Sequence, residues 1–127
     1  MGGDAQGRPR ILVVDDDDLV RWVLVQSLRQ RGYEVLAAGT ARQALEQFRS
    51  ADLVLLDWRL PDEDGLEVAR RVKEERPERP VILITAHNAA ELADAAAPLD
   101  VEGVLDKPFD VEVVLRAVRE ALERRSS

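Results

Sequence analysis

The segment Leu53-Val54-Leu55-Leu56 runs directly into Asp57 and Trp58, so four apolar residues end abruptly at a carboxylate. A short apolar run of this kind is typical of a strand that is buried on both faces inside a parallel sheet. Such a strand delivers its last residue to the carboxyl edge of the sheet, where open α/β folds bind their ligands. Asp57 is therefore the first candidate for chemistry.

Similar apolar runs alternate with helical patterns along the chain. We expect strands at residues 11–14, 33–38, 53–56, 81–84 and 103–105. The first helix carries an apolar stripe of Leu19, Val20, Val23, Leu24, Ser27 and Leu28. Thr40 and Asp110 are suited to cap the second and last helices, the third ends before Pro77, and the fourth covers 89–97. Strands that alternate with helices predict a doubly wound α/β fold, with five parallel strands and helices on both faces.

Composition narrows the class of protein. A chain of 127 residues, 46% hydrophobic and 34% charged, suits one globular domain. The formal net charge of -7 disfavours direct nucleic-acid binding. No apolar run approaches the ~20 residues that span a bilayer, and no cysteine is present, so we expect a cytoplasmic protein without a membrane contact. We assign residues 1–9 to a disordered leader, 10–124 to the domain and 125–127 to a polar tail.

Several polar residues follow the predicted strands. Asp15 and Asp16 follow the first, Asp57 ends the third, Thr85 closes the fourth and Lys107 follows the fifth. Because parallel strands end at one edge, these side chains should meet there. Carboxylates held close need a proton or a cation, and Mg²⁺ is typically bound by carboxylates, waters and substrate phosphate. A carboxylate in such a site can attack phosphorus, while Lys107 and Thr85 supply a positive charge and a hydroxyl.

Structural interpretations of these residues stay open. An aspartate after a strand is often a helix cap, which we favour for Asp18 and hold equally open for Asp17. Thr85 alone is consistent with turn chemistry. Lys107 is one of two lysines in a chain that otherwise uses arginine. The joint arrangement is more specific than any single member.

The chain resembles a receiver domain of bacterial two-component response regulators. The motifs that carry the resemblance are ILVVDDD at residues 11–17, LLDWRLPDEDG at 55–65, ITAH at 84–87 and KPF at 107–109. The resemblance to the chemotaxis-type family implies a flavodoxin-like sheet with the strand order 2-1-3-4-5. Residues 15–24 and 85–87 further resemble the nitrogen-regulation (NtrC-like) subgroup.

The resemblance also implies a role for each site residue. Asp57 is the phosphoacceptor, Asp16 binds Mg²⁺ directly, Asp15 binds it largely through water, and the backbone carbonyl of Arg59 is a further ligand. Thr85 and Lys107 contact the phosphoryl group. The peptide bond between Lys107 and Pro108 is expected to be cis, and Gly65 fits the backbone of the loop that opens the third helix. The implied partner is a histidine kinase or phosphotransfer domain, with homodimerisation through helix four, strand five and helix five.

Three features depart from the family pattern. Val104 stands where the family usually has a tyrosine or phenylalanine that changes rotamer, and Asp100-Val101 replace a usual Gly-Ala. The fourth helix is rich in alanine, so we expect it to be short, shifted or mobile. Trp58 could form a rim of the pocket, contact a partner or be partly buried in the ordinary way, and His87 could tune water access or be a solvated loop residue.

Three functions compete. The first is a phosphorylation-driven switch that catalyses its own phosphoryl transfer and dephosphorylation but turns over no free substrate, and so is not an enzyme. The second is an unphosphorylated interaction module with the same fold, which Val104 and the altered fourth helix favour. The third, a haloacid dehalogenase-type phosphohydrolase, needs an acid two residues after the nucleophile, where Arg59 stands.

Overall fold

Over the described residues 7–86, 88–107 and 110–126 of the computed structural model, five parallel strands form one sheet in the order β2-β1-β3-β4-β5. This confirms the order that the family resemblance implies. The strands are β1 (Arg10–Val14), β2 (Glu34–Ala38), β3 (Leu53–Asp57), β4 (Val81–Thr85) and β5 (Gly103–Asp106). Each predicted strand is present, with ends that differ from the prediction by one residue at most.

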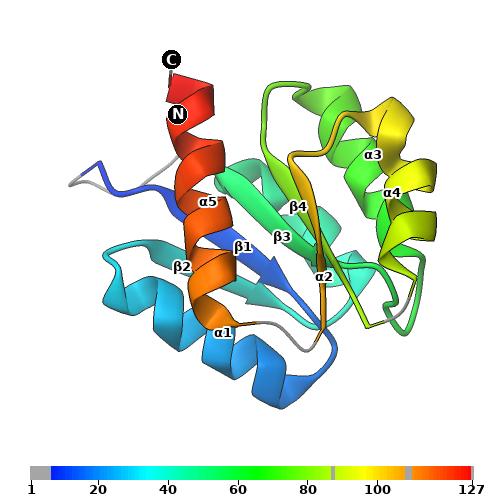
Figure 1. The fold of residues 1–127 in the computed structure, drawn as a ribbon. Coiled ribbons are helices and arrows are strands. Elements are labelled where there is room, and N and C mark those ends of the chain that lie inside the picture. The colour runs from blue at the N-terminus through cyan, green and yellow to red at the C-terminus, as the bar shows by residue number, and fades with distance from the viewer. Residues whose placement is uncertain (1–6, 87, 108–109, 127) are drawn as a thin grey trace.

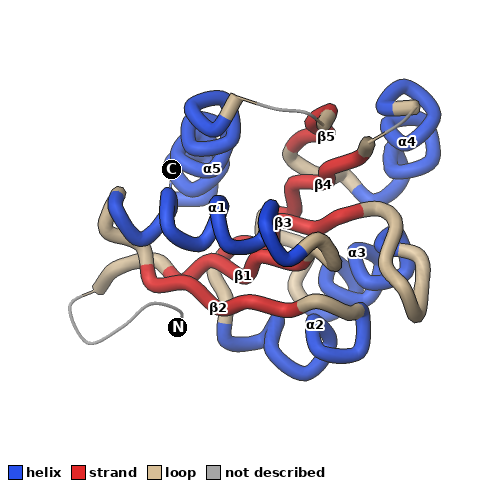
Figure 2. The backbone as a smooth tube through the Cα atoms, turned by 90° about the horizontal axis from the view of Figure 1, so that it is seen from below, coloured by secondary structure: helices blue, strands red, loops and turns tan. Residues whose placement is uncertain are grey.

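Five α-helices connect and cover the strands, as Figure 1 shows. They are α1 (Asp18–Gln30), α2 (Ala41–Gln47), α3 (Gly65–Glu75), α4 (Ala89–Ala96) and α5 (Val111–Ser126), with short 3-10 turns η1 (Phe48–Ser50) and η2 (Ala97–Leu99). Viewed along the sheet in Figure 2, α1 and α5 lie on one side, and α2, α3 and α4 lie on the other. The molecule is therefore a three-layer α/β sandwich.

The apolar runs of the sequence are strands buried on both faces. In β1, Ile11 and Val13 pack against α1 and α5, whereas Leu12 and Val14 pack against the helices of the opposite face. Every residue of β3 and β4 is buried. Because side chains alternate across a strand, a strand covered on both sides needs apolar residues throughout.

The start of α1 corrects two predictions. Asp17 caps this helix, because its Oδ1 accepts hydrogen bonds from the backbone N–H groups of Leu19 and Val20 at 3.0 and 3.1 Å. Asp18, which we favoured as the cap, is instead the first helical residue, and its carboxylate pairs with Arg21. Leu19 is 69% exposed and does not belong to the inward stripe. The stripe begins at Val20, which lies one turn before Leu24 and packs against the core, whereas Leu19 lies on another side of the helix.

Other helix ends agree with their expected caps. The Thr40 hydroxyl accepts from the backbone N–H of Gln43, and the Asp110 carboxylate accepts from that of Glu112. Helix α4 is short, with eight residues, as expected from its alanine content. The expected leader at 1–9 and tail at 125–127 fall partly on residues outside the described ranges. Among the described residues, no helix combines the length and apolarity needed to cross a membrane.

Candidate functional site

Because all five strands are parallel, their carboxyl ends lie at the same edge of the sheet (Figure 1). A cavity of about 670 Å³ opens there. Its lining includes the last residues of β3 and β4 and residues from the loops that follow β1, β3, β4 and β5: Asp16, Asp17, Asp57, Arg59, Thr85, Ala86, Asn88 and Lys107. Side chains far apart in sequence thus share one cavity, as the sequence predicts.

Three carboxylates form the acidic centre of this edge. Asp15, Asp16 and Asp57 each offer one oxygen, and these oxygens lie within 4.8 Å of one another. Asp15 and Asp57 are buried, at 1% and 5% exposure, whereas Asp16 is exposed. Buried like charges at this separation repel one another strongly, and oxygen donors are the ligands that Mg²⁺ prefers. The donor set therefore fits a hard divalent cation.

The carboxyl group of Asp57 has a raised pKa. Its Oδ1 accepts a hydrogen bond from the backbone N–H of Arg59 at 3.3 Å, and its Oδ2 lies 3.1 Å from the Nζ of Lys107. Burial and the negative charge of Asp15 raise the pKa of Asp57 to about 6, although Lys107 and the backbone N–H of Arg59 act to lower it. A cation beside Asp57 would favour its ionised, nucleophilic form.

Lys107 joins the two buried carboxylates. Its Nζ lies 2.8 Å from Oδ2 of Asp15 and 3.1 Å from Oδ2 of Asp57. Burial acts to lower the pKa of Lys107, but the hydrogen bonds and charges of the two aspartates outweigh it, so the pKa is raised. The backbone N–H of Lys107 also donates to the Thr85 carbonyl at 2.7 Å, which fixes where the side chain starts. The expected cis bond involves Pro108, which lies outside the described residues.

Thr85 is the last residue of β4 and is only 1% exposed at the wall of the cavity. Its strand neighbour Ile84 is paired in register with Asp57. The Thr85 hydroxyl therefore lies one residue further along the sheet, toward its carboxyl edge, than the backbone of Asp57. Residue 87, the histidine that we expected either to tune water access or to be solvated, lies outside the described residues.

The loop between β3 and α3 is tied down at its base. The backbone N–H of Gly65 donates to the carbonyl of Trp58 at 2.6 Å, and Arg59 and Asp64 form an isolated antiparallel bridge. A Cβ atom on Gly65 would lie 2.2 Å from the carbonyl oxygen of Asp57. Glycine is therefore required here for close approach of two backbone segments, which agrees with its expected place in the loop.

Trp58 is buried rather than placed at the pocket rim. The side chain is 6% exposed and packs in the cluster between the sheet and helices α2 to α4. The guanidinium of Arg59 lies 4.4 Å from the centre of the Trp58 ring, which suits a cation–π contact. Val104 is half-buried and packs against the same cluster. Trp58 is thus the aromatic residue next to the phosphoacceptor candidate, and position 104 carries none.

Two contacts of the site were not predicted from the sequence. Both carboxylate oxygens of Asp62 accept hydrogen bonds at the start of α2, from the backbone N–H groups of Ala41 and Arg42 at 2.9 and 3.0 Å. Arg21 donates to the main-chain carbonyl of Asp15 at 2.7 Å. Both are side-chain contacts between separate elements, so no local periodicity signals them.

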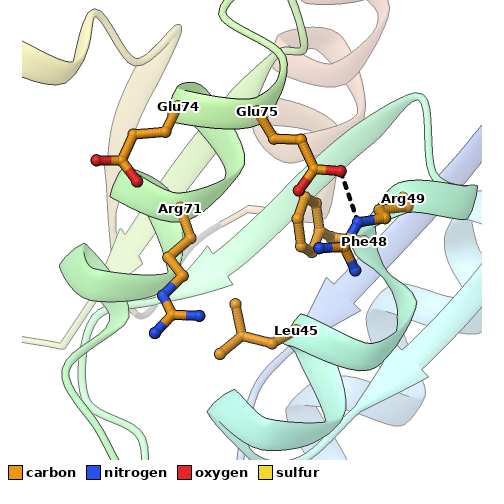
Figure 3. Close-up of a pocket in the computed structure, with 6 residues that line it drawn as sticks. All are labelled: Leu45, Phe48, Arg49, Arg71, Glu74 and Glu75. Carbon is orange, nitrogen blue, oxygen red and sulfur yellow. Dashed lines mark hydrogen bonds and ion pairs between the residues drawn. The ribbon is translucent and has the colours of Figure 1, made fainter.

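A second cavity of about 280 Å³ lies between the C-terminal parts of α2 and α3, away from the strand-end residues (Figure 3). Phe48 and Leu45 form its apolar part, and Arg49 pairs with Glu75 at 2.5 Å across it. Its charged groups of both signs include an ion pair, and it lacks the clustered carboxylates of the first cavity. Among the described residues, the cluster of three carboxylates that could hold a metal ion lies at the carboxyl edge.

Comparison with known proteins gives a consistent result. The family model described as response regulator receiver domain matches residues 11–119. The DNA-binding transcriptional regulator NtrC of Proteus hauseri is 36% identical over 114 residues, which are 88% of this chain and 24% of that protein. The curated relatives are longer, and the chain spans about 24% to 60% of their length.

Solved structures resemble the fold closely. A CheY-like receiver domain protein from Methanospirillum hungatei superposes with a TM-score of 0.88 at 29% identity, covering 94% of this chain and 97% of that one. The BeF3-activated receiver domain of DrrB, a Thermotoga maritima protein, superposes with a TM-score of 0.85 at 33% identity, covering 91% of this chain and 98% of that one.

Proposed function

Because the chain belongs to the response regulator receiver domain family of two-component systems, we propose that Asp57 accepts a phosphoryl group from a histidine kinase or phosphotransfer domain. Mg²⁺ is the proposed cofactor. The observation that carries this proposal is the position of Lys107, whose amine contacts both Asp15 and Asp57 at the edge of a three-carboxylate cluster. A buried nucleophile, an acidic cation site and an ammonium group are the components that phosphoryl transfer to a carboxylate needs.

The residues of this chain divide the proposed task between them. Asp15, Asp16, Asp57 and the carbonyl of Arg59 would hold Mg²⁺, with Asp15 acting largely through water. The bound cation would neutralise charge on the carboxylates and on the phosphoryl oxygens. One Asp57 oxygen forms a bond to phosphorus while the bond from phosphorus to the donor breaks, and its electron pair leaves with the donor. Lys107 and Thr85 then bind the oxygens of the transferred group.

The proposed output is a change of surface. The added negative charge attracts Lys107 and Thr85 toward the phosphoryl oxygens and alters the face formed by α4, β5 and α5. Homodimerisation through this face is one proposed consequence. The domain would catalyse only its own phosphorylation and dephosphorylation, in the cytoplasm, without turnover of a free substrate. Acidic charge supports a protein partner for the domain rather than direct nucleic-acid contact.

Labelling with a small phosphodonor tests the proposal. We expect acetyl phosphate with Mg²⁺ to add one phosphoryl group, detected by mass spectrometry of the intact protein, and chelation of Mg²⁺ to abolish the addition. Asp57→Ala should remove the label, whereas Asp94→Ala, which deletes an exposed carboxylate on α4, should keep it. Persistent labelling of Asp57→Ala would refute the assignment of the acceptor.

A second candidate is an interaction module that keeps the fold without phosphorylation. Val104 favours it, because valine cannot make the rotamer change of the aromatic residue usual at this position. The two candidates differ in Mg²⁺ binding. Failure of the wild-type protein both to bind Mg²⁺ and to become labelled would favour the interaction module.

A further inference from the structure

Arg21 spans the acidic loop that joins β1 to α1. Its Nη1 donates a hydrogen bond to the main-chain carbonyl of Asp15 at 2.7 Å, and its Nη2 donates to Oδ1 of Asp18 at 2.5 Å. The Arg21 side chain is 24% exposed and thus largely enclosed, whereas that of Asp18 is 91% exposed. One guanidinium therefore bonds to both ends of the run of four aspartates.

The Asp15 end of this bridge is the more constrained one. The backbone N–H of Asp15 donates to the carbonyl of Ala38 at 3.1 Å, its Oδ1 accepts from the backbone N–H of Asp17 at 2.9 Å, and its Oδ2 lies 2.8 Å from Nζ of Lys107. Arg21 adds the bond to the Asp15 carbonyl, which belongs to the peptide group leading into Asp16. The orientation of that peptide sets where the Asp16 carboxylate starts.

A neighbouring glycine leaves room for this contact. Gly39 directly follows β2, and a Cβ atom there would lie 3.3 Å from Nη1 of Arg21. The guanidinium therefore lies between the loop after β1 and the turn after β2. An arginine that is enclosed on two sides and bonded to a main-chain carbonyl has few accessible rotamers, so it can hold the position of that carbonyl.

We infer that Arg21 is a positioning residue for the acidic cation site, because it holds the loop so that the carboxylates of Asp15 and Asp16 face Asp57. This inference rests on the proposed function, since Mg²⁺ is the cation concerned. Arg21 lies outside the set of residues that line the cavity. It acts through the backbone of Asp15 and not through a contact with the cation.

The direction in which Mg²⁺ affinity changes when Arg21 is replaced distinguishes a positioning role from a purely electrostatic one. A positive charge near a cation site weakens binding of Mg²⁺, so removal of the Arg21 charge alone would make binding tighter. Loss of the bond to the Asp15 carbonyl would instead let the carboxylates move apart and make binding weaker. The two effects predict opposite changes in Mg²⁺ affinity.

The experiment is a titration with magnesium chloride, read by the fluorescence of Trp58. The chain has two tryptophans, so all variants carry Trp22→Phe, a substitution at a side chain that is 59% exposed. Arg21→Met removes the charge and both hydrogen bonds but keeps an apolar stem. Arg21→Lys keeps the charge but cannot reach both acceptors with one amine. Arg42→Met is the matched control, because it removes an arginine charge that is 86% exposed at the start of α2.

We expect Arg21→Met and Arg21→Lys each to weaken Mg²⁺ binding by about tenfold, equivalent to about 1.4 kcal/mol, and Arg42→Met to bind like the parent. Unchanged or tighter binding by either Arg21 variant would overturn the inference. Should Arg21→Met not fold, as judged by thermal unfolding, Arg21→Lys alone decides. Absence of Mg²⁺ binding by the parent would instead refute the proposed cation site, so the two failures are distinguishable.

Discussion

The amine of Lys107 lies 3.1 Å from a carboxylate oxygen of Asp57, although 50 positions separate the two residues in the chain. The strands β3 and β5 are not neighbours, since β4 lies between them. The contact therefore depends on a long side chain that crosses the end of β4. This geometry makes Lys107 the proposed cation for the phosphoryl oxygens.

Replacement of Lys107 by methionine should slow labelling by acetyl phosphate while leaving Mg²⁺ binding intact or tighter. Loss of one preorganised donor to a developing negative charge typically costs about 10²-fold in rate, and loss of a positive charge favours a cation. Labelling rates at saturating Mg²⁺ check the first effect, and a Mg²⁺ titration checks the second. Lys107→Arg should recover part of the rate, since it restores charge with a different donor geometry. An undiminished labelling rate in Lys107→Met would exclude the proposed role.

The raised pKa of Asp57 predicts that the contribution of this residue to the stability of the metal-free protein falls as pH rises. The folded-state pKa is about 6 and the ordinary value is 3.8, so between these values the folded state holds more protons than the unfolded state. By linkage, the free energy of unfolding then decreases with pH, and the loss is complete above about pH 6. The pKa difference corresponds to about 2–3 kcal/mol.

Asp57→Asn removes this titration and should be about 2–3 kcal/mol more stable than the wild type at pH 7 without Mg²⁺. The difference should shrink toward zero near pH 4. Urea denaturation at both pH values measures it. Addition of Mg²⁺ should stabilise the wild type and not the variant, because a ligand bound only by the folded state adds to its stability. A variant no more stable than the wild type at pH 7 would contradict the assigned shift.

Gly65→Ala should destabilise the protein strongly. The added Cβ would lie 2.2 Å from the Asp57 carbonyl oxygen and 2.9 Å from that of Trp58, and both are backbone atoms that cannot turn aside. We expect a loss of about 3 kcal/mol or more in urea denaturation, with a displaced loop after β3. Gly103→Ala is the matched control, since no atom lies within 4 Å of a Cβ there, and it should change stability by less than about 0.5 kcal/mol. Equal stability of the two variants would show that the loop rearranges freely.

The sheet and the meeting of the site residues could be predicted because they follow from local patterns. Apolar runs such as 53–56 and 81–84 mark strands buried on both faces, and parallel strands bring their last residues to one edge. The predicted placement of Asp57, Thr85 and Lys107 needed only this topology. Its detailed order, 2-1-3-4-5, came from resemblance and not from periodicity.

Other features could not be predicted, because they depend on the local backbone conformation or on contacts between separate elements. Among four successive aspartates, the cap is chosen by the backbone conformation at Asp17, which composition does not reveal. Lys73 is buried and pairs with Glu102 at 3.2 Å near the start of β5, a contact across 29 positions. The bonds made by Arg21 and Asp62 are of the same kind. Each joins groups whose relative position only the folded chain determines.

Asp62→Ala should lower stability in a manner that depends on pH. Its carboxylate accepts hydrogen bonds from Ala41 and Arg42, and these bonds lower the pKa of Asp62 below its ordinary value. Because the folded-state pKa is depressed, the stabilisation is present above the unfolded-state pKa and is lost as pH falls through the folded-state pKa. The variant and the wild type should thus converge in thermal stability at acid pH. Thr40→Ala removes an uncharged cap from the same helix and should lower the free energy of unfolding by about 1 kcal/mol at both neutral and acid pH.

Helix α4 should exchange its backbone amides faster than α3. Its N-terminal neighbour Asn88 has a left-handed backbone, φ 59°, and makes no side-chain capping bond. Its buried residues are Leu92 and Ala96, whereas α3 has a capping aspartate and buries five residues. A small buried area and an uncapped end both lower the free energy of local opening. Hydrogen exchange followed by mass spectrometry should show α4 opening at least about tenfold more readily than α3, since the difference in local stability exceeds about 1.4 kcal/mol. Protection of α4 equal to that of β3 would mean that Leu92 and Ala96 hold this helix as firmly as the central sheet is held. The alanine-rich sequence would then give no basis for a mobile surface at α4, β5 and α5.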